Sequence, residues 1–219
     1  RFMRDELGLS YWAITDHSKS SFQANGLDED RLRRQIDTIR KLNSELQKED
    51  SGFELLTGSE VDILPDGSLD FDDDLLSELD VVVASVHSSF TQPEKKMTER
   101  IISAVKNPNV TMIGHLTGRL LLMRKAYEVD QKAVINACAK HGTWIELNCH
   151  PRRFDMDWRL WRYAISKGVK CVINCDAHAN DHAAFLRLGA HHARKAGLRS
   201  QDVVNTLSLP ELKKELASN

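Results

Sequence analysis

The chain has 219 residues, of which 41% are hydrophobic and 28% charged, a composition typical of a soluble globular protein with room for one α/β domain and a sizeable core. The formal net charge of -2 excludes a general basic surface for nucleic acid, so a nucleic-acid substrate would need local cations or bound metal. No apolar run is long enough to span a membrane, and the first residues lack the apolar segment of a signal peptide.

Taken in chain order, hydrophobic periodicity predicts strands that alternate with helices. The first eight residues read as the end of a helix closed by Gly8. The expected strands cover residues 11–15, 53–60, 81–86, 110–114, 143–147 and 169–174. The expected helices cover residues 28–48, 72–79, 93–105, 129–140, 157–166 and 181–196. A small hairpin is expected around Pro65–Gly67, and residues 200–216 should form short helical pieces over the bottom of an α/β domain.

Polar side chains occur where these predicted strands end. They are Asp16, His17, Glu60, His87, His115, Asn148, His150, Asp176 and His178. Each histidine alone is more often a hydrogen-bonded core or loop residue than a ligand. The carboxyl ends of parallel strands meet at one rim, however, so these side chains can converge although they are far apart in the sequence. Imidazoles and carboxylates together suit Zn, Mn or Fe, and sites with several metal ions favour phosphoester chemistry.

Several neighbours of these residues have roles that the sequence leaves open. Asp16 is either a ligand or the hydrogen-bond partner of one. Asn148 and His150 would coordinate metal, contact substrate or cap a loop, whereas His182 is more readily a structural residue or a ligand's partner. Cys149 is expected as a small buried side chain, with metal ligation as the alternative.

Three arginines follow predicted strands and suit phosphate oxygens, with solvated surface arginines as the plain alternative. They are Arg119, Arg152 and Arg153. Arg119 is favoured because it lies just past a strand end. Trp158 and Trp161 are interpreted as packing residues rather than platforms for base stacking.

The four cysteines and the first residue of the sequence bear on the compartment and the domain context of the chain. The cysteines have no CxxC spacing, which favours a reducing cytoplasm over a disulfide framework. The sequence does not begin with Met, so we expect it to start inside a longer protein. No low-complexity linker divides the chain, and residues 1–219 are expected to form one domain.

Several segments resemble the motifs of the polymerase-and-histidinol-phosphatase (PHP) superfamily. They are Thr15–Ser18, Gly58–Ile63, Ser85–Ser88, Gly114–Arg119 and Asp176–His178. Among members of this superfamily, the chain is most similar to the C-terminal PHP domain of bacterial family X DNA polymerases. The segments that carry this closer similarity are Thr15–Ser20, Glu60–Gly67 and Glu146–Arg153.

The resemblance implies a distorted seven-stranded (βα) barrel of the PHP type, here lacking its first strand and the His-x-His motif on that strand. It implies two to three divalent metal ions, manganese or zinc with iron as an alternative. The ligands implied by motif are His17, Glu60, His87, His115, Asp176 and His178. It also implies phosphoesterase action on DNA 3′ ends, as 3′-5′ exonuclease, 3′-phosphatase and abasic-site cleavage, beside an upstream polymerase domain.

The expected mechanism is attack by metal-activated water on phosphorus. Its catalytic residues would be Arg119 and Asp16. Its substrate-binding residues would be Arg119, Arg152, Arg153, Ser18 and Lys19. One alternative is a small-molecule phosphatase of the histidinol-phosphate phosphatase type, and another is a catalytically silent structural or DNA-positioning module.

Overall fold

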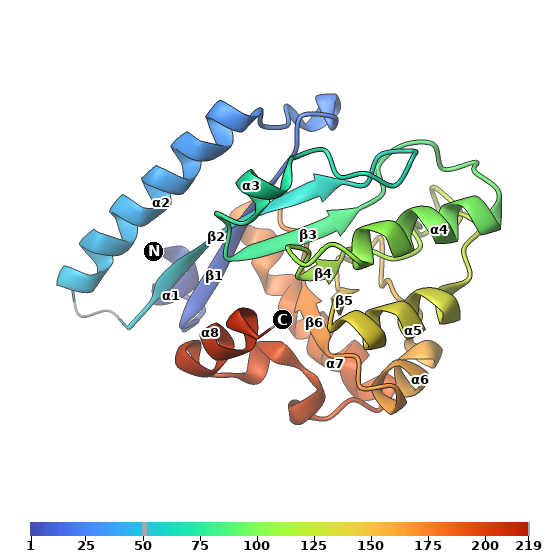
Figure 1. The fold of residues 1–219 in the computed structure, drawn as a ribbon. Helices are drawn as coiled ribbons and strands as arrows, with labels where there is room; N and C mark the ends of the chain where they lie inside the picture. Colours follow the sequence, from blue (N-terminus) through green and yellow to red (C-terminus); the bar gives the residue numbers. More distant parts are fainter. Residues whose placement is uncertain (50–51, 219) are drawn as a thin grey trace.

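The computed structural model describes residues 1–49 and 52–218, which contain one sheet of six parallel strands in the order β1-β2-β3-β4-β5-β6. The strands are β1 (Tyr11–His17), β2 (Glu54–Asp62), β3 (Val81–Ser85), β4 (Met112–Ile113), β5 (Trp144–Asn148) and β6 (Cys171–Asn174). The sheet curls as a half-barrel, with β1 and β6 as its edges (Figure 1). The predicted α/β class is confirmed. Six strands agree with a partial (βα) barrel, and the seven-stranded barrel remains an expectation.

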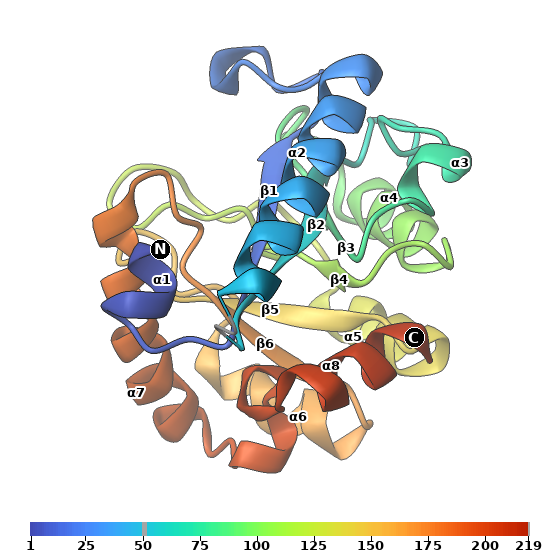
Figure 2. The same cartoon turned by 90° about the vertical axis from the view of Figure 1, so that its left-hand side faces the viewer.

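Helices connect the strands and cover the outside of the sheet (Figure 2). The α-helices are α1 (Phe2–Asp5), α2 (Glu29–Lys48), α3 (Asp73–Leu76), α4 (Glu94–Val105), α5 (Gln131–His141), α6 (Trp161–Ser166), α7 (Leu186–Ala196) and α8 (Leu209–Ala217). The 3-10 helices are η1 (Phe22–Ala24), η2 (Trp158–Leu160), η3 (Asn180–Phe185), η4 (Ser200–Asp202) and η5 (Val204–Thr206). In α2, Asp28 accepts a hydrogen bond from the Arg31 amide at 2.8 Å and so caps the first turn.

Some expected elements are shorter than predicted. The strand expected over 110–114 is reduced to β4, because the Val110 amide bonds to the Asn107 carbonyl in a turn and His115 leaves the extended conformation at φ +20°. The helix expected over 72–79 is reduced to α3. The helices expected over 157–166 and 181–196 each begin with a 3-10 segment, η2 and η3. These differences lie at element ends, where short-range patterning is weakest.

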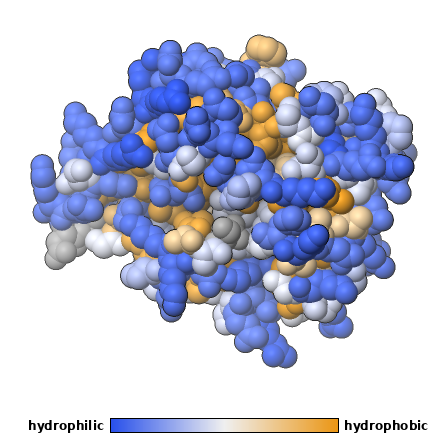
Figure 3. All heavy atoms as spheres, viewed as in Figure 1, coloured by the Kyte–Doolittle hydropathy of each residue, from blue (hydrophilic) through white to orange (hydrophobic). Residues whose placement is uncertain are grey.

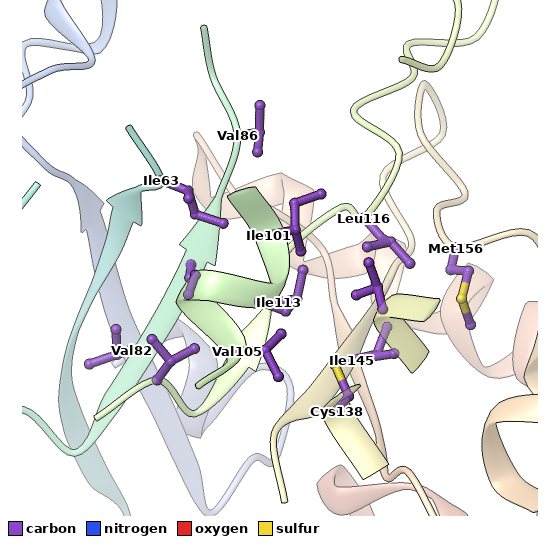
Figure 4. Close-up of a cluster of buried hydrophobic side chains, with 14 of the residues drawn as sticks. Ile63, Val82, Val86, Ile101, Val105, Ile113, Leu116, Cys138, Ile145 and Met156 are labelled. Carbon is purple, nitrogen blue, oxygen red and sulfur yellow. The ribbon is translucent and has the colours of Figure 1, made fainter. Parts of the chain in front are cut away.

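The main core lies between the sheet and its outer helices. Figure 4 shows side chains from β3, α4 and β5 meeting there, among them Val82, Ile101 and Ile145. All five residues of β3 are buried, as its continuous β-branched sequence predicts. Val82 faces this core, whereas its neighbour Val83 faces a second apolar cluster on the inner side of the sheet.

The C-terminal segment closes the end of the sheet where the strands begin. Leu212 of α8 joins the inner cluster, and the Tyr11 hydroxyl at the start of β1 donates to the Leu207 carbonyl at 3.1 Å. Lys213 binds Glu54, the first residue of β2, at 2.8 Å. This agrees with short helical pieces packed over the bottom, and it leaves the opposite rim for a site.

A cavity of about 1260 Å³ separates the two edge strands, β1 and β6. Its lining includes His17 and Asp176 at the carboxyl ends of these strands and Leu212 at the other end. On the face in Figure 3, hydrophilic side chains cover most of the surface, and apolar atoms show between them. Within the described part of the chain, no helix has the length and apolar character needed to cross a membrane.

All four cysteines are buried free thiols, and burial raises their pKa values, for Cys138 and Cys175 to about 12. Cys149 packs toward α7, since a Cβ added at Gly189 would lie 3.2 Å from its Sγ.

We therefore expect no rapid reaction of the four buried thiols of the native protein with a disulfide reagent at pH 8, because thiolate is the reactive form. After unfolding, all four thiols of the chain should react with the reagent. Fast labelling of even one thiol in the native state would contradict this packing.

Candidate metal centre

Three predicted ligands converge at the carboxyl ends of the first three strands. His17 ends β1 and pairs in register with Glu60 on β2, and His87 follows β3 by two residues. One ligand atom from each of the three lies within 4.8 Å of the others. The His17 Nδ1 atom is 3.5 Å from a Glu60 carboxylate oxygen, and the His87 Nε2 atom is 3.2 Å from the other. This group has the residues and spacing to hold a divalent metal ion.

His115 extends the cluster from the end of β4. Its Nε2 atom lies 3.0 Å from the Glu60 carboxylate and 3.3 Å from His87 Nε2, and the residue is 1% exposed. Burial alone would raise the pKa of Glu60, but hydrogen bonds with His115 and His87 lower it well below its usual value. Glu60 is therefore a buried anion among three imidazoles, which is a favourable environment for a cation.

An unpartnered nitrogen of His17 supports a metal in this position. His17 Nδ1 and His115 Nδ1 are buried and have no hydrogen-bond partner among the described residues. Buried polar atoms normally find a partner, so each such atom requires an explanation. His17 Nδ1 faces the Glu60 carboxylate at 3.5 Å, so a bound cation would satisfy it, whereas His115 faces Glu60 with Nε2 and its Nδ1 lies on the other side of the ring. Imidazole with carboxylate is a donor set suited to Zn, Mn or Fe. The residues present therefore fit a divalent metal.

Asp62 fixes the orientation of His87 and was not singled out from the sequence as a site residue. Its carboxylate bonds to His87 Nδ1, which directs Nε2 toward Glu60. Burial alone would lower the pKa of His87, but hydrogen bonds to Asp62 and Glu60 raise it to about 10. The signal was present in the sequence, because Asp62 follows Glu60 by two residues and therefore shares its face of the strand.

Replacing Asp62 with asparagine should weaken metal binding by about tenfold to a hundredfold, since a ligand's carboxylate partner holds the ring in place. The affinity for Mn²⁺ would be measured by calorimetry. Asp66→Asn is the matched control, because Asp66 lies four residues on in an exposed turn. Equal affinities for both variants would show that Asp62 does not position His87.

Asp176 and His178 lie next to this cluster, past the end of β6. The Asp176 carboxylate accepts hydrogen bonds from Arg153 Nε at 2.9 Å and Asn148 Nδ2 at 3.2 Å. Its backbone is left-handed, with φ +51°, a conformation that is uncommon for non-glycine residues and recurs at ligand and active sites. The exposed His178 ring lies 6.0 Å from that of His17, between ring centroids. The structure thus brings these two predicted ligands to the edge of the cluster.

Glu146 is a second buried carboxylate that the sequence did not single out. It accepts hydrogen bonds from the His115 amide at 2.6 Å and from the side-chain amides of Asn148 and Asn174, each at 3.1 Å. Burial is the main reason that its pKa rises to about 7. It lies two residues before Asn148 on the inner face of β5, and it holds the segment that carries His115.

Three residues predicted near β1 lie apart from the cluster. Asp16 points to the opposite face of the strand, where its carboxylate bonds to Gln35 of α2. Ser18 is buried, and its hydroxyl accepts a hydrogen bond from the Asp62 amide at 2.9 Å. The Lys19 ammonium pairs with Glu29. Their predicted catalytic and substrate-binding roles remain predictions.

The predicted arginines have different surroundings. Arg119 donates from Nε to the Arg153 carbonyl at 2.9 Å and from Nη2 to the Phe154 carbonyl, so it connects two loops. Arg153 binds Asp176, while its Nη1 atom is buried without a described partner. Arg152 is exposed. Trp161 is fully buried in the core, as predicted, and Trp158 is exposed at 37%.

The chain is similar in sequence to bacterial polymerases and phosphatases. It is 42% identical over 212 residues to the DNA polymerase/3'-5' exonuclease PolX of Bacillus subtilis, a match that covers 97% of this chain and 36% of that protein. It is 30% identical over 165 residues to a probable phosphatase of Thermoanaerobacter sp. (strain X514), covering 71% of this chain and 65% of that protein.

A third relative is matched over most of its length. A probable phosphatase of Acetivibrio thermocellus is 30% identical over 179 residues, which are 78% of this chain and 68% of that protein. No protein-family model matches the chain. The polymerase carries its PHP domain at its C-terminal end, and the probable phosphatases are of the PHP kind. The chain therefore belongs to the PHP superfamily, in the branch of the C-terminal PHP domains of bacterial family X DNA polymerases.

Proposed function

We propose that this chain is a metal-dependent phosphoesterase that acts on DNA 3′ ends, as 3′-5′ exonuclease and 3′-phosphatase with abasic-site cleavage as a further activity. The single observation that carries the proposal is the cluster of Glu60 with His17, His87 and His115, at a rim that the strand ends share. The names of the polymerase/exonuclease and phosphatase relatives support a phosphoesterase. The 97% coverage of this chain by the polymerase match supports a DNA substrate.

The residues that would hold the metal are the six predicted ligands. They are His17, Glu60, His87, His115, Asp176 and His178. Two to three divalent ions, Mn or Zn with Fe as the alternative, would supply Lewis-acid activation of phosphoryl oxygens and of water when bound. The protein's own contribution is to hold the ligands rigidly, through the contacts of Asp62 to His87 and of Glu146 to the His115 amide.

Cationic groups at the rim would bind the substrate. Arg153 already bonds to Asp176, so its guanidinium lies beside a predicted ligand, and its Nη1 has no partner among the described residues. Arg119 holds the loop of Arg153 in place through the carbonyls that it binds, and in the proposed mechanism it adds positive charge there. Ser18, Lys19, Asp16 and Arg152 complete the proposed set of substrate-binding and catalytic residues.

We also propose that residues 1–219 act as one PHP domain beside a polymerase domain in a longer cytoplasmic protein. The match to B. subtilis PolX covers nearly all of this chain but 36% of the polymerase, which supports this arrangement. A free-standing small-molecule phosphatase is the second candidate, and the likeness to the probable phosphatases favours it.

The proposal is tested by comparing substrates with the metal-loaded protein. A 3′-phosphorylated oligonucleotide, a 3′-hydroxyl oligonucleotide and histidinol phosphate would be supplied separately with Mn²⁺ or Zn²⁺. We expect turnover of both oligonucleotides and its loss with a chelator. Faster turnover of histidinol phosphate would favour the small-molecule phosphatase. Absence of turnover with every substrate, despite bound metal, would favour a structural or DNA-positioning module.

A further inference from the structure

Three aromatic side chains form a compact group beside the candidate metal centre. His150 follows β5, and His182 and Phe185 belong to η3 after β6. The ring centroids of the two histidines are 5.5 Å apart, and each lies 5.2 Å from that of Phe185. All three residues are partly exposed, although the rings pack on one another.

Backbone amides determine the tautomer of both imidazoles. The Arg152 amide donates to His150 Nδ1 at 3.2 Å, and the His178 amide donates to His182 Nδ1 at 3.2 Å. A neutral imidazole has one acceptor nitrogen and one N–H, so the proton of each ring lies on Nε2. Each Nε2–H is thus a hydrogen-bond donor, and neither ring keeps a free lone pair for a metal ion. This pair is suited to an acceptor on a substrate.

The position of the pair places these donors next to the predicted ligands. β5 is the one described strand whose end supplies no predicted ligand, and His150 occupies that place on the rim. The Asn148 side chain connects His150 to the site, since it accepts from the His150 amide at 3.1 Å and donates to Asp176 at 3.2 Å. His182 is joined to the backbone of His178. The exposed Arg152 adds a guanidinium that has no side-chain partner among the described residues.

We propose that the Nε2–H groups of His150 and His182, with Arg152 as counter-charge, bind the nonreacting phosphodiester next to the reacting phosphate of a nucleic-acid 3′ end. His182 stacks on Phe185 and His150 meets both rings edge to face, while neither Nε2 atom is among the buried unpartnered atoms of the described residues. Edge N–H groups and a guanidinium match anionic oxygens. The inference rests on the proposed function, and it names the part of the substrate that a small monoester lacks.

A thermodynamic cycle between protein and substrate tests this contact. The full metal-loaded chain is titrated with a 5′-labelled single-stranded oligonucleotide, and the Kd is measured by fluorescence anisotropy. A terminal phosphorothioate slows cleavage, and the adjacent linkage is either the natural phosphodiester or a neutral methylphosphonate. We expect the methylphosphonate to weaken binding by the wild-type protein about tenfold, because a hydrogen bond to a charged group is lost.

In His150→Phe, the same change of linkage should weaken binding less than about twofold, because the donor is gone while the aromatic packing is kept. His150→Gln should restore the tenfold sensitivity, since its amide can donate from a similar place. His141→Phe, an exposed histidine of α5, is the matched control and should behave like wild type. The proposal would be overturned if the methylphosphonate reduced the affinity of wild type and His150→Phe equally, or if it reduced the affinity of neither.

His182→Phe provides the second arm if His150→Phe does not fold. The metal content of this variant is measured as well, because His182 also accepts a hydrogen bond from the amide of His178, a predicted ligand. Normal metal content together with a Kd that no longer depends on the methylphosphonate would support the subsite. Hydrolysis of p-nitrophenyl phosphate by the wild-type protein, assayed in parallel, tests the proposed function separately. Failure of that hydrolysis would contradict the proposed 3′-phosphatase activity, while the binding cycle would still decide whether this pair contacts the phosphodiester.

Discussion

Replacing Glu60 with glutamine should reduce phosphoester hydrolysis by about a hundredfold to a thousandfold, the range seen when a preorganised electrostatic contact is removed from an active site. Glu60 lies within 3.5 Å of ring nitrogens of His17, His87 and His115, so one substitution affects the surroundings of all three. Glutamine has nearly the same volume, and the loss of activity would therefore reflect the lost negative charge rather than a cavity. Metal content per chain, measured by elemental analysis, should fall in parallel.

Glu99→Gln is the matched control for this result. Glu99 is an exposed carboxylate on α4, and its neutralisation should leave both metal content and hydrolysis within about twofold of wild type, as for most surface substitutions. Circular dichroism would confirm that both variants are folded. Full metal content and full activity in Glu60→Gln would show that the cluster is an ordinary buried hydrogen-bond network rather than a metal site.

The rim of the sheet was predictable because two short-range signals coincide there. Apolar runs mark the strands, and His17, His87 and His115 stand where those runs end. Parallel topology then brings the ends together, so His17 and Glu60 are opposite each other in register although they lie 43 positions apart in the sequence. Neither the register nor the rotamers were needed for that prediction, because all strand ends share one rim.

Other parts of the site depend on alternation and on distant contacts. Asp62 and Glu146 could have been found from the alternation of side chains along a strand, since each lies two residues from a predicted site residue and so shares its face of the sheet. The position of Arg119 could not, because its partners are backbone carbonyls 34 and 35 residues away. The Nδ1 contacts of His150 and His182 are likewise set by loop conformations that hydrophobic periodicity does not describe.

Replacing Arg100 with methionine should destabilise the fold by about 3 kcal/mol, because the buried Ile63 carbonyl and the partly buried Ser88 carbonyl would lose their charged donor. Arg100 is 2% exposed and donates from Nε to the Ile63 carbonyl and from Nη1 to the Ser88 carbonyl, each at 3.0 Å. Methionine keeps the apolar length of the side chain, so the measured loss would reflect hydrogen bonding and charge. The free energy of unfolding would be obtained from urea titration of the metal-free protein.

The same substitution should also lower the affinity for metal, because Arg100 in the core holds two segments that carry site residues. Ile63 follows Asp62 and Ser88 follows His87, so Arg100 ties together the two chain segments whose side chains form the Asp62–His87 contact. Lys96→Met, one turn earlier on the exposed face of α4, should change stability by less than about 0.5 kcal/mol. Equal unfolding free energies for Arg100→Met and Lys96→Met would mean that water replaces the guanidinium without cost, and the two segments would then be held by the strands alone.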